Sequence, residues 1–282
     1  MRRKALTQRI AFILLGLSTL AIAAPVILIL GFIIVKGLPA ISIEFLTEAP
    51  RDFLRQGGIY PAIIGTLYLV LGTALFSLPL GVATAIYLNE YAQKGAATRL
   101  IRLAIVNLAG VPSVVYGLFG LGLFVLALQF GSSILAGSLT LGLLILPVII
   151  TTAEEALKTV PDSLRQASLA LGATKWQTIT NVVLPQATPG ILTGAILGVG
   201  RAAGETAPIL FTVAAFYLPF LPRSAFDQVM ALPYHLFVVS TQIPGISETT
   251  QFGTALVLLS IVIGVNLTAV LLRSRLRKQR RT

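Results

Sequence analysis

The sequence predicts an all-α, polytopic membrane protein with six transmembrane helices. Hydrophobic residues fill 56% of its 282 positions and charged residues only 11%, about half the charged share of an average soluble domain. The apolar residues fall in six runs, each long enough to cross a hydrocarbon layer about 30 Å thick. These runs lie near residues 10–35, 62–88, 103–129, 133–153, 187–218 and 252–272.

The positive charges lie mostly on one of the two sides that these spans define. The N-terminal segment, the second and fourth connections and the C-terminal tail hold 16 of the 21 Lys and Arg residues. Cytoplasmic loops carry such an excess, so both termini are expected in the cytoplasm, with residues 36–60 and 219–251 outside. The net charge of +11 thus reflects topology, and the basic cytoplasmic tail 273–282 can contact anionic membrane lipid. Nucleic-acid binding is not expected.

Several classes of chemistry are excluded by what the sequence lacks. It has no cysteine and a single histidine, His235, which we interpret as structural, so no thiolate or histidine metal site is expected. Gly172-Ala173-Thr174-Lys175 lacks the spacing of a phosphate-binding glycine loop. We therefore expect no metal, no cofactor and no catalytic residue. If ATP drives this protein, another chain hydrolyses it.

The first span has an alternative interpretation. Met1-Arg2-Arg3-Lys4 followed by apolar residues, with Ala21-Ile22-Ala23 downstream, resembles a cleavable signal peptide. The apolar run continues to Val35, however, well beyond a signal-peptide core of about 7–15 residues. We expect residues 1–60 to form a retained helix and an outer segment, and residues 61–272 to form the main transmembrane domain.

Spans two to five each contain or adjoin a proline, namely Pro79, Pro112, Pro147 and Pro208. A proline frees a backbone carbonyl and bends a helix, which suits a bundle that opens and closes. The alternative is that proline is simply common in membrane helices.

The fifth span has the most informative helix face. Glycines recur along it every four residues, at Gly190, Gly194 and Gly198 and again at Gly200 and Gly204. Small residues at this spacing let two helix backbones approach closely. Positions 194, 198, 201, 205 and 208 share one stripe of a continuous helix, so Arg201 and Glu205 are expected to face protein and not lipid.

Arg201 and Glu205 are the only charges that the sequence places deep inside an apolar span. A guanidinium near the centre of a bilayer costs roughly 3 kcal/mol even on lenient scales, so such a residue is a functional candidate by default. The alternative is a self-neutralising pair that only holds helices together.

The connection 154–186 is too polar for the membrane and too regular for a linker. Gly172 is placed to end one short helix, and Thr174 to start a second one through a capping box, which Leu184-Pro185 ends. Two short helices with an exposed apolar face form a knob for a partner's groove. The alternative is a helix lying on lipid, to which Trp176 is also suited.

This connection resembles the coupling segment of ABC importer permeases, in which Glu-Ala-Ala is followed by a glycine and then by an apolar residue, Leu and Pro. Here Gln166-Ala167-Ser168 precedes Gly172, and Val183-Leu184-Pro185 closes the segment. Gln replaces the family's Glu and Ser its second Ala. The resemblance implies a contact with a separate ATPase, made or shaped by Gln166, Ala167, Ser168, Gly172, Thr174, Trp176, Leu184 and Pro185.

Further motifs are similar to those of phosphate-specific ABC permeases, namely Gly200-Arg201-Ala202-Ala203-Gly204-Glu205-Thr206-Ala207-Pro208 and the third-span segment 110–120. Segments 57–60, 85–91 and 231–235 favour the PstA group over its PstC partners. The resemblance covers nearly the whole chain from about residue 40. It implies a type I ABC importer permease fold with cytoplasmic coupling helices. It also implies an assembly with a PstC-type permease, two PstB-type ATPases and a periplasmic or lipid-anchored PstS-type phosphate-binding protein.

The resemblance implies a permease subunit of an ATP-driven importer of inorganic phosphate in the cytoplasmic (inner) membrane, with Arg201, Glu205 and Thr206 on the substrate pathway. Arg can grip phosphate oxygens in a bidentate fork and Thr206 adds a hydroxyl, while Glu205 partly neutralises Arg201 so that the anion is released. Alternatives are a permease for another oxyanion such as sulfate or molybdate, an ion-coupled secondary transporter gated by the Arg–Glu pair, and a membrane scaffold. A self-contained carrier needs no knob for an ATPase, and a scaffold leaves the charges unexplained.

Overall fold

The computed structural model describes residues 2–93 and 95–278, and this part of the chain is mostly helical, which confirms the all-α prediction. In chain order the helices are α1 (Arg2–Gly37), α2 (Ile43–Thr47), α3 (Tyr60–Ile86), α4 (Ala96–Ala109), α5 (Ser113–Gly120), α6 (Ile134–Lys158), α7 (Asp162–Ala170), α8 (Lys175–Thr178), α9 (Leu184–Gly204), α10 (Ala207–Thr212), α11 (Leu232–Thr241) and α12 (Glu248–Lys278). They are joined by a 3₁₀ turn, η1 (Leu38–Ala40), by three π-helical turns, η2 (Tyr87–Tyr91), η3 (Leu121–Ala127) and η4 (Ile179–Val183), and by a hairpin of β1 (Pro50–Arg51) and β2 (Gln56–Gly57).

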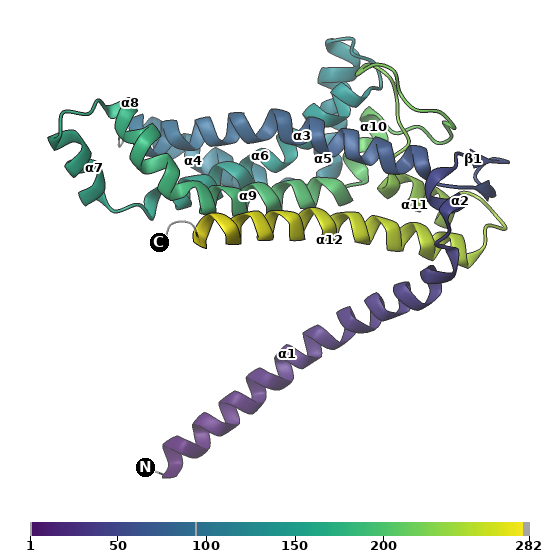
Figure 1. The fold of residues 1–282 in the computed structure, drawn as a ribbon, viewed down its shortest axis with the longest axis horizontal. Helices are drawn as coiled ribbons and strands as arrows, with labels where there is room; N and C mark the ends of the chain where they lie inside the picture. Colours follow the sequence, from purple (N-terminus) through teal and green to yellow (C-terminus); the bar gives the residue numbers. More distant parts are fainter. Residues whose placement is uncertain (1, 94, 279–282) are drawn as a thin grey trace.

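Four long helices, α3, α6, α9 and α12, run along the long axis of the molecule (Figure 1). α6 packs against both α3 and α9, and α12 packs against α9. Leu141, Ile145 and Ile149 of α6 are almost fully buried, so this helix forms the centre of the core. Lipid tails are as apolar as these side chains, so close packing holds such helices together.

α1 leaves the bundle and extends away from it (Figure 1). Near its C-terminal end Phe32 packs edge-on against Phe252 of α12, with ring centroids 5.2 Å apart. Further back along α1 the described apolar side chains are largely exposed. The predicted span 10–35 corresponds to the apolar stretch Ala11–Ala40 of this helix.

Five helical stretches are long and apolar enough to cross a membrane, and a bent pair makes a sixth if it is counted as one span. The pair is α4 with the α5–η3 stretch, which meet at 103°. The continuous third span predicted for 103–129 is therefore wrong in shape. The break falls at Gly110-Val111-Pro112, where Pro112 lacks the N–H that would continue the ladder of α4 and instead precedes α5.

The fifth span differs from its prediction at both ends. α8, η4 and α9 form one helical stretch, Lys175–Gly204, so Leu184-Pro185 does not end a helix. Pro185 instead lies in the first turn of α9, where a missing N–H is tolerated. At the other end α9 stops at Gly204, short of the predicted 218.

Three of the predicted glycines form a seam between α9 and α6. A side chain added at Gly190 or Gly194 would overlap Ala156 or Thr152 of α6, and one added at Gly198 would meet Ile149 of α6 at 3.2 Å. The residue numbers of these partners fall along α6 as those of the glycines rise along α9, because the two helices are antiparallel. The glycines of the four-residue repeat thus leave room for side chains of α6 against the backbone of α9.

The other two glycines of the repeat have different surroundings. Gly200 faces Asn266 of α12. Gly204 has open space where a side chain would lie, and the packing expected of it is not seen among the described residues, because α9 ends at this position.

The bundle has two different ends (Figure 1). α7 and α8 lie at one end, while α2, the hairpin and α11 lie at the other. His235 of α11 is buried at this second end, and its Nδ1 has no hydrogen-bond partner among the described residues. Burial lowers the pKa of His235 to about 4, so the imidazole is neutral at pH 7, in agreement with a structural role.

We expect Gly194→Ala to destabilise the protein, because its methyl group would overlap the side chain of Thr152. Overpacking of a close-fitting interface costs about 1–3 kcal/mol. Gly204→Ala is the matched control, since nothing lies within 4 Å of its added carbon. Thermal unfolding in detergent should show a lower Tm for Gly194→Ala alone; equal Tm values in the two variants would contradict the seam.

The buried His235 predicts a loss of stability in acid. Its folded-state pKa of about 4 lies below the unfolded value of about 6.5, so the unfolded chain takes up the proton first. Stability is therefore retained above pH 6.5 and falls by about 3 kcal/mol between pH 6.5 and pH 4. His235→Leu should remove this part of the pH dependence of Tm, and an unchanged pH dependence in the variant would refute the prediction.

Candidate functional site

Arg201 and Glu205 form an ion pair where α9 ends. Arg201 Nε donates a hydrogen bond to Glu205 Oε1 at 3.0 Å. Arg201 lies in the last turn of α9, where the partial negative charge of the helix C-terminus favours a cation. The side chain of Arg201 is 42% exposed and that of Glu205 is 16% exposed. The pair therefore lies at the surface of this chain, with the carboxylate turned inward, and not deep inside the bundle as the sequence suggested.

The backbone breaks directly after this pair. Glu205 has an extended ψ of 130°, and Pro208 lies in the first turn of α10. Pro208 has no N–H to donate to the carbonyl of Gly204, so the ladder of α9 cannot continue. The stripe expected across positions 194–208 is consequently interrupted, and Thr206 lies half-buried in the link between the two helices.

The break lies against the third-span motif. α10 packs on α5, and a side chain added at Gly117 would come within 3.0 Å of the backbone of Ala207 and Pro208. Tyr116 and Ile209 belong to one buried apolar cluster. The two motifs that pointed to the same family are thus in direct contact, although they lie about ninety residues apart in the sequence.

The cavity next to Glu205 is too small for an oxyanion. Glu205, Thr66 and Ala203 line a cavity of only about 10 Å³. A larger cleft of about 620 Å³ between α3, α4, α5 and α6 is lined almost entirely by apolar side chains such as Ile105 and Phe119. Since an anion needs convergent polar groups, neither of these two cavities offers an oxyanion site.

The segment between α6 and α9 is built by two strong local signals. Gly172 has a left-handed φ of +85°, which a residue with a side chain adopts only at a cost. The N–H groups of Gly172 and Ala173 donate to the carbonyls of Leu169 and Ser168, a Schellman ending of α7. The predicted capping box is also present, since Thr174 and Gln177 exchange side-chain-to-backbone hydrogen bonds of 2.8 and 3.3 Å at the start of α8.

This segment leaves an apolar patch uncovered at the end of the bundle, which we call the α7–α8 patch. It comprises Leu164, Leu169, Leu171 and Trp176, whose exposed fractions run from 40% to 88%. Gln166 and Ala167 are exposed beside it. Ser168 is turned inward, where its hydroxyl lies 2.9 Å from that of Thr178. Leu184 and Pro185 are half-buried at the start of α9 and do not belong to this patch.

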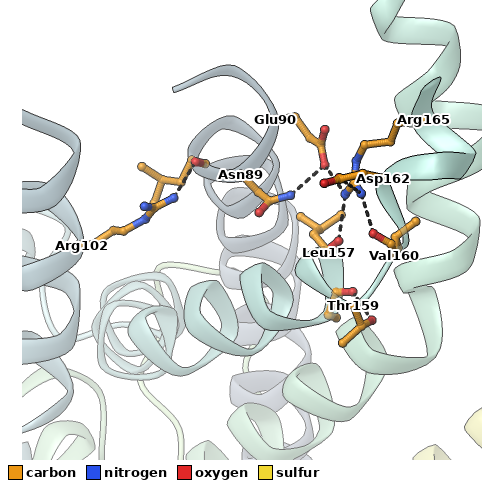
Figure 2. Close-up of polar contacts among 10 residues, drawn as sticks. Asn89, Glu90, Arg102, Leu157, Thr159, Val160, Asp162 and Arg165 are labelled. Carbon is orange, nitrogen blue, oxygen red and sulfur yellow. Dashed lines mark hydrogen bonds and ion pairs between the residues drawn. The ribbon is translucent and has the colours of Figure 1, made fainter. Parts of the chain in front are cut away.

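The structure also contains buried ion pairs that the sequence analysis did not identify. Figure 2 shows Arg165 of α7 reaching Glu90 of η2 at 2.9 Å. Glu154, near the end of α6, is buried as well and pairs with Arg102 at 2.9 Å and with Lys158 at 3.2 Å. Sequence analysis had used these cations only to assign the topology. The one feature of the sequence that could have indicated these pairs is the position of Glu90 and Glu154, each at the end of a predicted apolar span.

The chain matches a known family model and several proteins of known name. The model for "binding-protein-dependent transport system inner membrane component" matches residues 77–281. A Mycobacterium leprae protein named phosphate transport system permease protein PstA is 37% identical, over 94% of this chain and 88% of its own length. A Bacillus subtilis protein named probable ABC transporter permease protein YqgI is 35% identical, over 93% and 94%. The Mycobacterium tuberculosis (strain H37Rv) PstA 1 is 38% identical, over 91% and 84%.

Solved structures share the fold at low identity. A bacterial ABC transporter involved in the import of alginate aligns with a TM-score of 0.66 and 16% identity, covering 91% of this chain and 95% of the other. The MetNI methionine ABC transporter aligns with a TM-score of 0.61 and 17% identity, covering 77% and 97%. These likenesses confirm the predicted permease fold. By the extent of the family match and the identity to its relatives, this chain belongs to the inner membrane components of binding-protein-dependent transport systems.

Proposed function

We propose that the chain is the permease subunit of an ATP-driven importer that carries inorganic phosphate across the cytoplasmic membrane. The substrate is suggested by relatives whose names state phosphate transport and that align over most of this chain. Within the structure, the observation that supports it best is the Arg201–Glu205 pair at the break between α9 and α10. A guanidinium can bind a phosphate through two parallel hydrogen bonds, and the paired carboxylate keeps that binding weak.

The exposure of Arg201 supports a site shared with a second permease. In a protein that spans a membrane, a half-exposed guanidinium in the last turn of a spanning helix is costly if it faces lipid. The cost is removed if a second chain of the PstC type covers this face. The adjoining cavity of about 10 Å³ cannot hold phosphate, so the pathway runs between the two permeases and not through this one.

The two ends of the bundle take different partners in this proposal. The assembly contains two PstB-type ATPases. The α7–α8 patch of this chain offers apolar side chains to a groove on one of them, and the partner permease binds the other. The opposite end, with α2, the hairpin and α11, receives a PstS-type phosphate-binding protein. The excess of Lys and Arg on the α7–α8 side supports a cytoplasmic position for that end and for both termini.

The proposal is tested with Arg201→Gln, Glu205→Gln and the double variant in a reconstituted complex. If Arg201 handles the anion, uptake of labelled phosphate collapses in Arg201→Gln and in the double variant, while the yield of assembled complex stays normal. If the pair is only structural, each single variant leaves the other charge unpaired and lowers the yield of assembled complex, and the double variant recovers. Sulfate and molybdate in parallel assays test the choice of oxyanion.

The control is Lys36→Gln, which removes a cation from an exposed pair with Glu248. Exposed pairs contribute about 0–1 kcal/mol, so uptake and assembly are expected to match the wild type. Restored uptake in the Arg201→Gln, Glu205→Gln double variant would overturn the role of Arg201 in moving phosphate.

A further inference from the structure

The turn η2, which ends α3, is held by two cations from the segment that carries the α7–α8 patch. Arg165 of α7 reaches Glu90, and Lys175 of α8 lies over the ring of Tyr91 with its Nζ 4.6 Å from the ring centroid. Glu90 and Tyr91 lie at the end of α3, whereas α7 follows α6 in the chain. The patch segment is therefore bound to α3 by side chains and to α6 and α9 by the backbone.

Arg165 joins three elements through one guanidinium (Figure 2). Its Nη2 donates to Glu90 Oε1 and to the carbonyl of Leu157, both at 2.9 Å, and its Nη1 donates to the carbonyl of Val160 at 2.6 Å. Leu157 lies in the last turn of α6, and Val160 lies two residues after the end of that helix. Nη1 also approaches Asp162 Oδ1 at 3.2 Å, on its own helix. A lysine cannot reproduce this set, because it lacks the planar fork of donors.

The Arg165–Glu90 pair is largely shielded from solvent, unlike most ion pairs among the described residues. The side chain of Arg165 is 16% exposed and that of Glu90 is 8% exposed. Asn89 Nδ2 donates to the same Glu90 oxygen at 2.8 Å, which fixes the carboxylate. The Lys158–Glu155 pair at the same end of the bundle is 45% and 73% exposed, and such pairs contribute little. Loss of Glu90 would leave Arg165 its bonds to two carbonyls and to Asp162, so the connection to η2 can be removed without leaving the guanidinium unpaired.

The turn that receives these contacts is π-helical, as is η4 on the other side of α7. Single π-helical turns are rare and are frequent at functional sites. α7 contacts η4 and reaches η2 through Arg165, so it is connected to both π-helical turns.

We propose that Arg165 and Glu90 are positioning residues that transmit movement of the α7–α8 patch to α3. This inference rests on the proposed function, in which an ATPase moves that patch. Lys175 on Tyr91 is a second, weaker connection to the same turn. When the ATPase displaces α7, the buried ion pair obliges η2 to follow, so that α3 moves together with α6 and α9. Without the pair, α7 can move while α3 stays in place, and ATP is hydrolysed without transport.

The test separates coupling from assembly in reconstituted complexes, by measuring complex yield, ATPase rate and uptake of labelled phosphate. Glu90→Ala removes the connection to η2 and leaves the bonds of Arg165 to the two carbonyls in place. We expect normal yield, a retained ATPase rate and at least a roughly fivefold loss of phosphate moved per ATP, a modest coupling between sites. Glu155→Ala is the matched control and should behave as the wild type, because its partner Lys158 keeps Glu154.

A covalent replacement gives a second and independent readout. The chain has no cysteine, so Glu90→Cys with Arg165→Cys can be joined by a short bis-maleimide in a complex with cysteine-free partners. Linking should restore phosphate moved per ATP above the value of the same variant before linking. A wild-type ratio in Glu90→Ala, a loss of assembly in that variant, or no gain on linking would each overturn the positioning role. A wild-type complex that hydrolyses ATP but takes up no phosphate would overturn the proposed function instead.

Discussion

The close approach of α9 to α6 along Gly190, Gly194 and Gly198 is the constraint on which the rest of the structure depends. Because lipid is as apolar as the helix surfaces, burial of apolar area does not hold two membrane helices together, and close packing must do so. The three glycines leave room on α9 for the side chains of Ala156, Thr152 and Ile149 of α6. This seam fixes α9 as the one helix whose position and rotation determine what both ends of the bundle present.

At one end, α9 is continuous with η4 and α8, so the patch segment is rigidly attached to it through a helix and not through a flexible loop. At the other end, α9 stops at Gly204 because Pro208 cannot extend its ladder. Arg201 then lies one turn before the break, half-exposed, with Glu205 at 3.0 Å. The same helix thus connects the end proposed for the ATPase to the residue proposed for the anion, and the buried Arg165–Glu90 pair extends this connection to α3.

Sequence patterns predicted the features that depend on local chemistry or on the bilayer. Hydropathy gave the all-α class and the approximate spans, because a helix that crosses lipid must be long and apolar. The capping box at Thr174 and the left-handed turn at Gly172 followed from side-chain chemistry within a few residues. The seam followed from the four-residue spacing of its glycines.

The features that the sequence did not predict depend on geometry between distant segments. A proline in a membrane helix can cause a mild kink or a full break, and only packing decided that Pro112 marks a bend of 103°. The exposure of Arg201 could not be predicted, because it depends on where α9 ends and on which neighbours cover its last turn. Arg165 and Glu90 lie 75 positions apart, so no local pattern identifies them as partners, and each alone resembles an ordinary interfacial charge.

The most direct test of this account is an experimental structure of the assembled complex in a lipid nanodisc, with two permeases and their ATPases. The account predicts that the guanidinium of Arg201 is covered by the second permease and that the α7–α8 patch is covered by an ATPase subunit. A map in which Arg201 faces lipid, or in which the patch lies on the membrane surface, would contradict it.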